Sequence, residues 1–372
     1  MTSEQRLAAI RAAMADKRLD VLIGIHDGAH FIEKPNPVMV LAGFKSLGPS
    51  AAVLDRNGDM HLVVTPEWDG ERAQEQCPNA QVHGATHIVT GLADCLTHHG
   101  GRAEGHAVGL AGSSALPWDI AEPLTKTLPH AQPADEVVFA STLTKTPEEI
   151  AHAGEAARIA EAGYERLLTI AKPGVSEDDL AAEIRWYTKS LGAEDNFIML
   201  CGGRHNRAVQ PSSGRRLAPG DIIVTEITPS YRGQLAQICR TIVLAQASQT
   251  LATKYALVVE AMNDGIRAAV PGVPMANVCR AINRRLEAEG YGEYCHPPHI
   301  RRRGHGLGFA STEPGDVSLD NETPLTPDMV FMIHPNQYLP ETGYLLCGEP
   351  VVMTRDGAQP LTRRQAALAE IP

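Results

Sequence analysis

Several features that this chain of 372 residues lacks exclude classes of function. No apolar run approaches the roughly 20 residues that a membrane-spanning helix needs, so we expect no membrane partner. Acidic residues outnumber basic ones by 44 to 33, and the net charge of -11 argues against a nucleic-acid partner, which calls for a basic face. The seven cysteines are an odd number without closely spaced pairs, which indicates neither a disulfide framework nor a zinc ribbon.

The remaining composition is that of an ordinary globular protein, with 43% hydrophobic and 21% charged residues. The chain is too long for one small core, and its length suits two domains. The N-terminal residues lack the apolar centre of a signal peptide, so the sequence predicts a cytoplasmic protein.

Alternating helical and strand-like segments in the first third of the chain predict an α/β domain. Residues 7–17 have a helical pattern of apolar side chains, and residues 21–25 form a short apolar run typical of a buried strand. Asn57-Gly58 between two further apolar runs is a strong hairpin signal. The polar loop 26–36 carries two histidines and two carboxylates, and it either reaches towards a site or is a solvated turn.

A helix start marks the boundary between two domains. Thr146 can cap the helix, Pro147 suits the first helical position, and Glu149 completes a capping box. We therefore place the boundary near Thr142, which gives an N-terminal domain of residues 1–142 and a C-terminal domain of residues 143–372.

The second domain contains an internal repeat. Residues 171–175 and 269–273 both end in Pro-Gly-Val, and each opens a helix-like stretch after a long helical segment. Polar, strand-like regions follow both copies. This repeated order predicts a domain built from two related halves, with a site where the halves meet.

Polar side chains interrupt the apolar strands of this domain. They are Glu226 and Gln237 on two strands predicted to pair, His305 between glycines, His334 at a strand end and Glu349 in the last strand. A carboxylate in an otherwise buried strand needs a partner, which usually means a site or a buried ion pair. Several such positions in one domain indicate a functional site.

The order of several short motifs in the second domain resembles that of a known family. The motifs are Thr146-Pro147-Glu148-Glu149-Ile150, residues 217–221, Cys239-Arg240-Thr241, Gly304-His305-Gly306-Leu307-Gly308, Glu313-Pro314 and residues 329–335. This order resembles the creatinase, aminopeptidase P and methionine aminopeptidase family, the pita-bread hydrolases. The resemblance implies an α+β fold with a smaller N-terminal creatinase-like α/β domain and a C-terminal pseudo-two-fold pita-bread domain. It also implies a homodimer, in which the 27–36 loop would complete the site of the partner subunit.

The same resemblance identifies five positions that hold two divalent ions in the metal-dependent members, as Asp, Asp, His, Glu and Glu. Here they fall on Glu226, Gln237, His305, His334 and Glu349, so only the third and fifth are unchanged. Two carboxylates can compensate one divalent ion but not two, and a neutral amide is a poor bridging ligand. We therefore expect no metal cofactor, as in creatinase.

The residues then predict a metal-independent hydrolase that cleaves a C–N bond of a small molecule. Glu226 and Glu349 would bind a cationic, amide, amidine or lactam substrate through charge-assisted hydrogen bonds. His305 or His334 would be the general base that activates water and then the acid that protonates the leaving nitrogen, and the sequence does not choose between them.

Further pocket positions are predicted to bind substrate: Gln237, Cys239, His205, Arg240 and Glu313. The family's additional pocket histidine falls by count on Val209, and His205 could replace it if the loop is reshaped. Cys239 lies two residues from Gln237 and is either a small buried apolar residue or a nucleophile. The basic run 301–303 is either an anchor for a substrate carboxylate or a solvated turn.

Other functions remain open. One is a mononuclear metallohydrolase, similar to an aminopeptidase or dipeptidase, that holds one divalent ion with Glu226, His305, His334 and Glu349. Another is a catalytically silent binding module, against which the four ionisable groups argue, because such groups are costly in strands. Proline-directed peptidase activity is expected less, since it depends on the two-metal centre.

Overall fold

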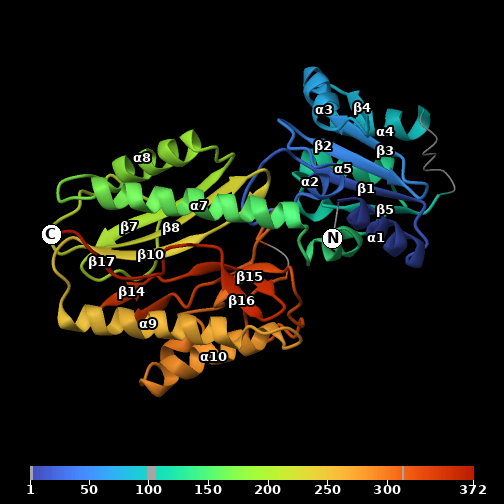
Figure 1. The fold of residues 1–372 in the computed structure, drawn as a ribbon. Coiled ribbons are helices and arrows are strands. Elements are labelled where there is room, and N and C mark those ends of the chain that lie inside the picture. Colours follow the sequence, from blue (N-terminus) through green and yellow to red (C-terminus); the bar gives the residue numbers. More distant parts are fainter. Residues whose placement is uncertain (1–2, 99–105, 312–313) are drawn as a thin grey trace. The chain divides into compact units, whose positions relative to one another are not determined.

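The computed structural model describes residues 3–98, 106–311 and 314–372, and the chain divides into two compact units, Met1–Leu143 and Thr144–Pro372 (Figure 1). Each unit has its own apolar core. The mixture of helices and largely antiparallel sheets is the predicted α+β class. None of the described helices combines the length and apolar character needed to cross a membrane. That residues 1–142 and 143–372 are independent domains stays a prediction.

The first unit is built on a six-stranded sheet with the order β4-β3-β2-β1-β5-β6. Its strands are β1 (Val21–His26), β2 (Ser50–Asp55), β3 (Met60–Val64), β4 (Gln81–Gly84), β5 (Val108–Ala111) and β6 (Gln132–Pro133). Its helices are α1 (Ser3–Asp16), α2 (Pro37–Ala42), α3 (Gly70–Gln76), α4 (Ile88–His98), α5 (Trp118–Thr127) and α6 (Asp135–Phe139), with short 3-10 turns at Glu67–Asp69, Ser113–Ala115 and Ala140–Thr142.

Alternation along the central strands explains how helices cover this sheet. Val21, Ile23 and Ile25 point to one face, where they pack with α4 and α5 in a single buried cluster. Helix α2 packs on β1 and β2. The predicted hairpin is confirmed, because β2 and β3 pair antiparallel across Asn57-Gly58, and the Asp55 carboxylate accepts both of their backbone N–H groups at 2.8 Å.

The second unit begins with α7 (Pro147–Ile170), and its capping box is formed as predicted. Thr146 Oγ1 accepts from the Glu149 backbone at 3.1 Å, and the Glu149 carboxylate accepts from the Thr146 N–H at 2.8 Å. The other helices are α8 (Glu177–Ser190), α9 (Gln249–Ala268) and α10 (Met275–Ala288), with a 3-10 turn at Gly292–Cys295. In Figure 1 the pair α7 and α8 and the pair α9 and α10 enclose the strands of this unit from opposite sides.

Two sheets lie between the helix pairs. The first has the order β17-β10-β8-β7 and the second the order β11-β12-β15-β16. Their strands are β7 (Asn196–Gly203), β8 (Ile222–Tyr231), β10 (Ile238–Val243), β17 (Ala369–Glu370), β11 (Gly304–Gly306), β12 (Val330–Ile333), β15 (Glu349–Thr354) and β16 (Gly357–Pro360). The short strand β9 (Gln234–Leu235) pairs with β8, and β13 (Gln337–Leu339) pairs with β14 (Gly343–Leu345).

The internal repeat predicted from sequence has a counterpart in hydrogen bonding. In the first half, the Gly174 N–H donates to the Leu217 carbonyl at 2.8 Å and the Leu217 N–H donates back to Val175 at 2.9 Å. In the second half, the Gly272 N–H donates to the Leu325 carbonyl at 2.7 Å, and the Leu325 N–H donates back to the Val273 carbonyl at 2.8 Å. The Pro-Gly-Val turn is therefore held by the same pair of backbone hydrogen bonds in both halves.

Candidate active site

Backbone hydrogen bonds join the two halves where the polar side chains gather. Glu226 of β8 lies opposite Cys239 of β10 in the antiparallel register. Cys239 in turn exchanges two backbone hydrogen bonds with Gly348, of 3.3 and 3.1 Å, directly before β15. Thr241 adds a side-chain bond of 2.9 Å to the Leu346 carbonyl. Residues from the first and second halves are thus held in one place.

A hydrogen-bonded chain runs from Glu226 through Gln237 to His305. The Gln237 Nε2 donates to Glu226 Oε2 at 3.4 Å, and its Oε1 lies 2.8 Å from His305 Nε2. Because the amide turns its nitrogen to the carboxylate, its oxygen faces the imidazole, whose other nitrogen, Nδ1, lies 3.0 Å from the Gly306 carbonyl. Gln237 therefore fixes the orientation of His305, which is 3% exposed.

Two neutral groups donate to the other oxygen of Glu226. The Cys239 Sγ lies 3.8 Å from Oε1, and the Asn336 Nδ2 lies 3.4 Å from the same atom. Burial raises the pKa of the Glu226 carboxyl group, while the thiol, the Arg302 charge and the Asn336 amide act in the opposite direction. The Glu226 carboxylate therefore binds a proton more readily than an exposed carboxylate does.

His334 directly follows β12, and its ring centroid lies 5.2 Å from that of His305. Its Nδ1 is buried and has no hydrogen-bond partner among the residues that the structure describes. Burial, reinforced by His305, lowers the pKa of His334 well below its usual value. His334 is therefore a neutral imidazole with a buried nitrogen available for a ligand or a proton.

Glu349 lies beside Arg240, and both side chains are almost fully buried. Arg240 Nη2 is 2.9 Å from Glu349 Oε1, and the Thr362 hydroxyl donates to the other carboxylate oxygen. Arg240 Nη1 also donates to the carbonyls of Cys239 and Gly348, at 3.0 and 2.7 Å. The structure thus places Arg240 as the counter-ion of Glu349, and its predicted contact with substrate stays a prediction.

Cys239 is fully buried, and burial raises its pKa well above the usual value for a thiol, with the Glu226 charge acting in the same direction. A protonated thiol that donates to a carboxylate is a weak nucleophile. The structure therefore favours the interpretation of Cys239 as a small buried residue of the pocket wall.

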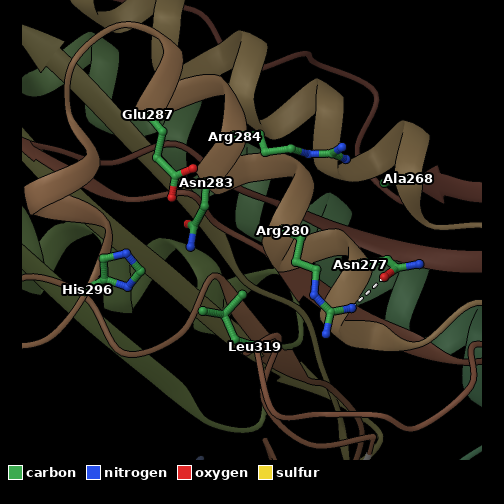
Figure 2. Close-up of a pocket in the computed structure, with 8 residues that line it drawn as sticks. All are labelled: Ala268, Asn277, Arg280, Asn283, Arg284, Glu287, His296 and Leu319. Atoms are coloured by element: carbon green, nitrogen blue, oxygen red, sulfur yellow. Dashed lines mark hydrogen bonds between the residues drawn. The ribbon is translucent and has the colours of Figure 1, made fainter.

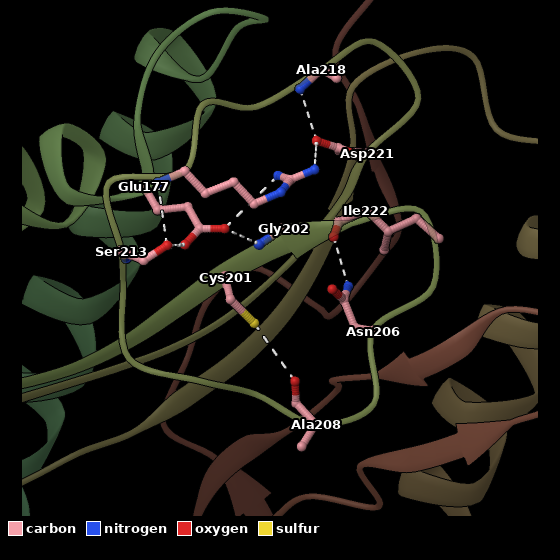
Figure 3. Close-up of polar contacts among 10 residues, drawn as sticks. Glu177, Cys201, Gly202, Asn206, Ala208, Ser213, Ala218, Asp221 and Ile222 are labelled. Atoms are coloured by element: carbon pink, nitrogen blue, oxygen red, sulfur yellow. Dashed lines mark hydrogen bonds and ion pairs between the residues drawn. The ribbon is translucent and has the colours of Figure 1, made fainter.

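Figure 3 shows how the loop between β7 and β8 is anchored. The Glu177 carboxylate accepts from the Gly202 N–H at 2.9 Å and from the Ser213 hydroxyl at 2.7 Å. At the end of the loop, Arg215 pairs with Asp221 at 2.8 Å. These two buried carboxylates hold the loop that carries His205 in a defined shape.

His205 is exposed, and the structure places it outside the hydrogen-bonded chain of Glu226, Gln237 and His305. Its Nε2 lies 3.0 Å from the Pro340 carbonyl, and its ring meets Tyr338 edge-on at 5.7 Å. The role of His205 in binding substrate stays a prediction. Glu313 lies outside the described residues, as does Thr312.

The basic run 301–303 contains a buried structural arginine that the sequence did not predict. Arg303 is 1% exposed, and it donates to Asn283 Oδ1 at 2.7 Å and to the Pro335 carbonyl at 2.7 Å. Figure 2 shows Asn283 in the wall of a cavity of about 510 Å³, which Arg280, Arg284 and His296 also line. Through its hydrogen bond to the Pro335 carbonyl, Arg303 holds the segment that follows His334 in place.

Sequence reasoning also missed two polar neighbours of Glu226. One is Asn336, which donates to the carboxylate and whose Oδ1 accepts from the Cys347 N–H at 3.1 Å. The other is Tyr344 of β14, whose pKa is raised by burial and also by the charge of Glu226. The position of Asn336, two residues after His334, was the one feature of the sequence that could have indicated its place at the site. No feature of the sequence indicated Tyr344.

The four side chains Glu226, His305, His334 and Glu349 fit one divalent ion in the kind of donor atom that they offer. Imidazole nitrogen and carboxylate oxygen are both zinc ligands, and His334 offers a buried nitrogen without a partner among the described residues. Arg240 balances the charge of Glu349, which leaves Glu226 as the uncompensated carboxylate of the set. Among the described residues, no three histidine, cysteine or acidic side chains of this cluster hold donor atoms within 4.8 Å of one another, so binding an ion needs side-chain rotation.

Comparisons with known proteins give the family context. Residues 151–355 match the model of metallopeptidase family M24. The chain is 28% identical to an uncharacterized peptidase, YqhT, of Bacillus subtilis over 87% of this chain and 90% of that protein. It is 27% identical to a Xaa-Pro dipeptidase of Pyrococcus furiosus over 91% of this chain and 94% of that protein.

A solved structure, a Xaa-Pro dipeptidase from Bacillus anthracis, superposes with a TM-score of 0.85 at 21% identity and covers 99% of this chain and 100% of that chain. A prolidase structure from Pyrococcus horikoshii gives a TM-score of 0.83 at 23% identity, with coverages of 97% and 99%. This likeness confirms the predicted two-domain pita-bread fold.

Two predictions from the sequence are wrong. The metal-independent hydrolase of a small cationic or amide-like substrate, and the absence of a metal cofactor, are both contradicted by the match to a metallopeptidase family and by relatives named as peptidases and Xaa-Pro dipeptidases. The error arose from treating the replaced ligand positions Glu226, Gln237 and His334 as the loss of metal chemistry. Hydrolase chemistry itself is confirmed, and the metal-dependent alternative agrees better with the relatives.

Proposed function

This chain belongs to metallopeptidase family M24, in agreement with the family predicted from its motifs, and on that premise we propose that it is a metal-dependent dipeptidase. Dipeptides with proline in second position are the proposed substrate class, because similar proteins carry the name Xaa-Pro dipeptidase. The proposal includes a homodimer, which the family resemblance implies, and a cytoplasmic location. In that homodimer, the 27–36 loop is proposed to complete the site of the partner subunit.

The observation that carries the proposal is the pair His305 and His334 beside Glu226. A neutral imidazole with a buried nitrogen that lacks a partner among the described residues is costly in a core unless it binds something. Next to it lies a second histidine whose orientation Gln237 fixes at 2.8 Å. A carboxyl group with a raised pKa completes a set that can bind and transfer protons.

Glu226, His305, His334 and Glu349 are the proposed ligands of a single divalent ion, and His305 Nε2 would exchange its hydrogen bond with Gln237 for the ion. When bound, such an ion polarises a peptide carbonyl as a Lewis acid. Burial raises the pKa of Glu349 and the buried Arg240 opposes that rise, so Glu349 shares its charge between Arg240 and the ion, while Glu226 supplies a carboxylate that forms no ion pair with an arginine among the described residues.

The chain's own residues have distinct tasks in this proposal. Before the ion binds, Gln237 holds His305 in one orientation, and the Asn336 amide holds one oxygen of Glu226. Glu226 binds the ion as a carboxylate, because the positive charge of the ion would oppose the rise that burial causes in its pKa. The neutral Cys239 thiol donates to the same carboxylate and keeps the pocket floor free of further charge.

The proposal is tested with full-length protein without an affinity tag, stripped of metal by a chelator. Hydrolysis of Xaa-Pro dipeptides is measured after adding Mn²⁺, Co²⁺ or Zn²⁺, together with the bound metal content. We expect activity to return with a single ion per chain, and His305→Ala and His334→Ala to abolish it. The exposed His130→Ala variant serves as the control.

Two outcomes would overturn the proposal. One is full activity in protein that contains no metal after chelation. The other is a folded, metal-loaded protein that hydrolyses no dipeptide, which is the behaviour of a catalytically silent module.

A further inference from the structure

Three side chains that the proposed function does not use converge in the first unit. His61 belongs to β3 and His83 to β4, and these strands are parallel neighbours with His61 opposite Gln81 and Val63 opposite His83. Side chains at alternate positions share a face, so both histidines point to the same side of the sheet. Helix α4 covers that side, and its Cys95 packs in the same buried cluster as Val63.

The donor atoms of these side chains are close together. His61 Nδ1 lies 3.1 Å from His83 Nε2, and the two rings stack at a centroid distance of 5.4 Å. One donor atom each from His61, His83 and Cys95 lies within 4.8 Å of the other two. A tetrahedral zinc ion, with bonds of about 2.0–2.1 Å to nitrogen and about 2.3 Å to sulfur, needs ligand atoms roughly 3.3–3.6 Å apart. The arrangement is within a small side-chain adjustment of that geometry.

Two of the three side chains, His61 and Cys95, are buried, and the third is partly exposed to solvent. His61 is 7% exposed and Cys95 is 4% exposed, whereas His83 is half-buried. His83 and Cys95 also line a cavity of about 440 Å³, together with Asp94 and His87. Three protein ligands with a cavity at the fourth position leave room for water or a carboxylate to complete the coordination.

We propose that His61, His83 and Cys95 bind one zinc-class divalent ion between the sheet and α4. Imidazole and thiolate ligands favour Zn²⁺ over the hard ions Mg²⁺ and Ca²⁺, which take oxygen ligands. Binding releases the thiol proton of Cys95, because the thiolate is the ligand form. The ion cross-links β3, β4 and α4, so it stabilises the first unit by binding only its folded state. This site is independent of the dipeptidase centre proposed in the second unit.

The test uses Co²⁺ as a spectroscopic substitute in the metal-free full-length protein without a tag. A cobalt ion bound to a cysteine thiolate gives a charge-transfer absorption in the near ultraviolet, which ligation by histidine and carboxylate does not give. We expect this absorption in the parent protein and its loss in Cys95→Ser. In His61→Gln and His83→Gln the Co²⁺ affinity should fall by at least about tenfold, since loss of even an indirect partner of a metal ligand costs that much.

Matched controls separate this site from the rest of the chain. Cys77→Ser removes another buried free cysteine of the same unit and should keep the absorption. The double variant His305→Ala, His334→Ala should also keep it, because it alters only the proposed catalytic centre. Zn²⁺ should raise the melting temperature of that double variant, and this rise should disappear when Cys95→Ser is added.

The proposal is overturned if the parent protein shows no thiolate absorption, or if a folded Cys95→Ser protein retains it. The histidines would then be only a hydrogen-bonded pair beside a core thiol. If Cys95→Ser does not fold, His83→Gln decides, because this half-buried side chain lies on the short strand β4. Unchanged Co²⁺ affinity in that variant overturns the proposal, and weakened affinity supports it.

Discussion

Arg240 Nη2 lies 2.9 Å from Glu349 Oε1, and the two side chains are 1% and 2% exposed. The residues are 109 positions apart in sequence, on β10 of one half and β15 of the other. Removing one member of a buried pair leaves the other charged and without compensation, which costs more than the pair contributes. The stability of the domain and the charge of the proposed metal site therefore depend on the same contact.

Arg240→Met should lower the free energy of unfolding by about 3–5 kcal/mol, because Glu349 is left as an unpaired buried carboxylate. Urea denaturation measures this loss. Arg267→Met is the matched control, since Arg267 pairs with Asp264 at the surface and should change stability by less than about 1 kcal/mol. The double variant Arg240→Met, Glu349→Leu should recover much of the loss. A single variant as stable as the parent would contradict this account.

Gln237→Asp should increase the number of divalent ions bound per chain. The substitution adds a third carboxylate, next to Glu226 and His305, and so raises the negative charge available to a second ion. Metal content after equilibrium dialysis measures the change. Gln237→Leu, which offers no ligand oxygen, should not increase it. Equal metal content in the aspartate variant and the parent would show that charge at this position does not set the stoichiometry.

Gly304→Ala should displace His305 and abolish activity. Gly304 has φ +152, and a Cβ there would overlap the Met332 carbonyl oxygen, so β11 must move away from β12. Overpacking of this kind typically costs about 1–3 kcal/mol, and thermal unfolding together with dipeptide hydrolysis measures both effects. Gly214→Ala is the control, because no atom lies within 4 Å of the place that a Cβ would take there. Parent-like activity in Gly304→Ala would remove β11 as the element that positions His305.

His26 should make the first unit less stable in mild acid. Burial lowers its pKa from 6.5 to about 4, with the charge of His30 acting in the same direction. Between these two values the unfolded chain binds a proton that the folded chain does not, so stability falls as the pH falls from 6.5 towards 4. The loss amounts to at most about 3 kcal/mol.

The measurement is urea denaturation at a series of pH values. His26→Gln should show a shallower dependence in that window than the parent, whereas the exposed His130→Gln variant should follow the parent. Identical slopes for the parent and the His26 variant would contradict the prediction.

Features encoded within a few residues were predictable from the sequence. The capping box at Thr146, the Asn57-Gly58 hairpin and the repeated Pro-Gly-Val turns each depend on neighbours along the chain. The order of motifs was also sufficient to identify the pita-bread fold. The strand position of Glu226 followed from its apolar neighbours, whereas Gln237, predicted on the returning strand, directly precedes β10.

Features that depend on distant partners were not predictable. The pairing of Arg240 with Glu349 and the burial of Arg303 join segments that only the folded chain brings together. The same holds for His61, His83 and Cys95, which lie on three separate elements with no short spacing between them. Counting charges at five motif positions led to the wrong cofactor, because a replaced ligand position does not by itself remove metal chemistry.

The matched turns at Gly174 and Gly272 have a consequence for the history of the chain. Each glycine donates to a leucine that donates back to the next residue, and unrelated segments have no reason to share this reciprocal pair. Such a match is what an internal duplication leaves, in agreement with the repeat predicted from the sequence. The proposed site then draws on both copies, with Glu226 and Gln237 from the first and His305, His334 and Glu349 from the second.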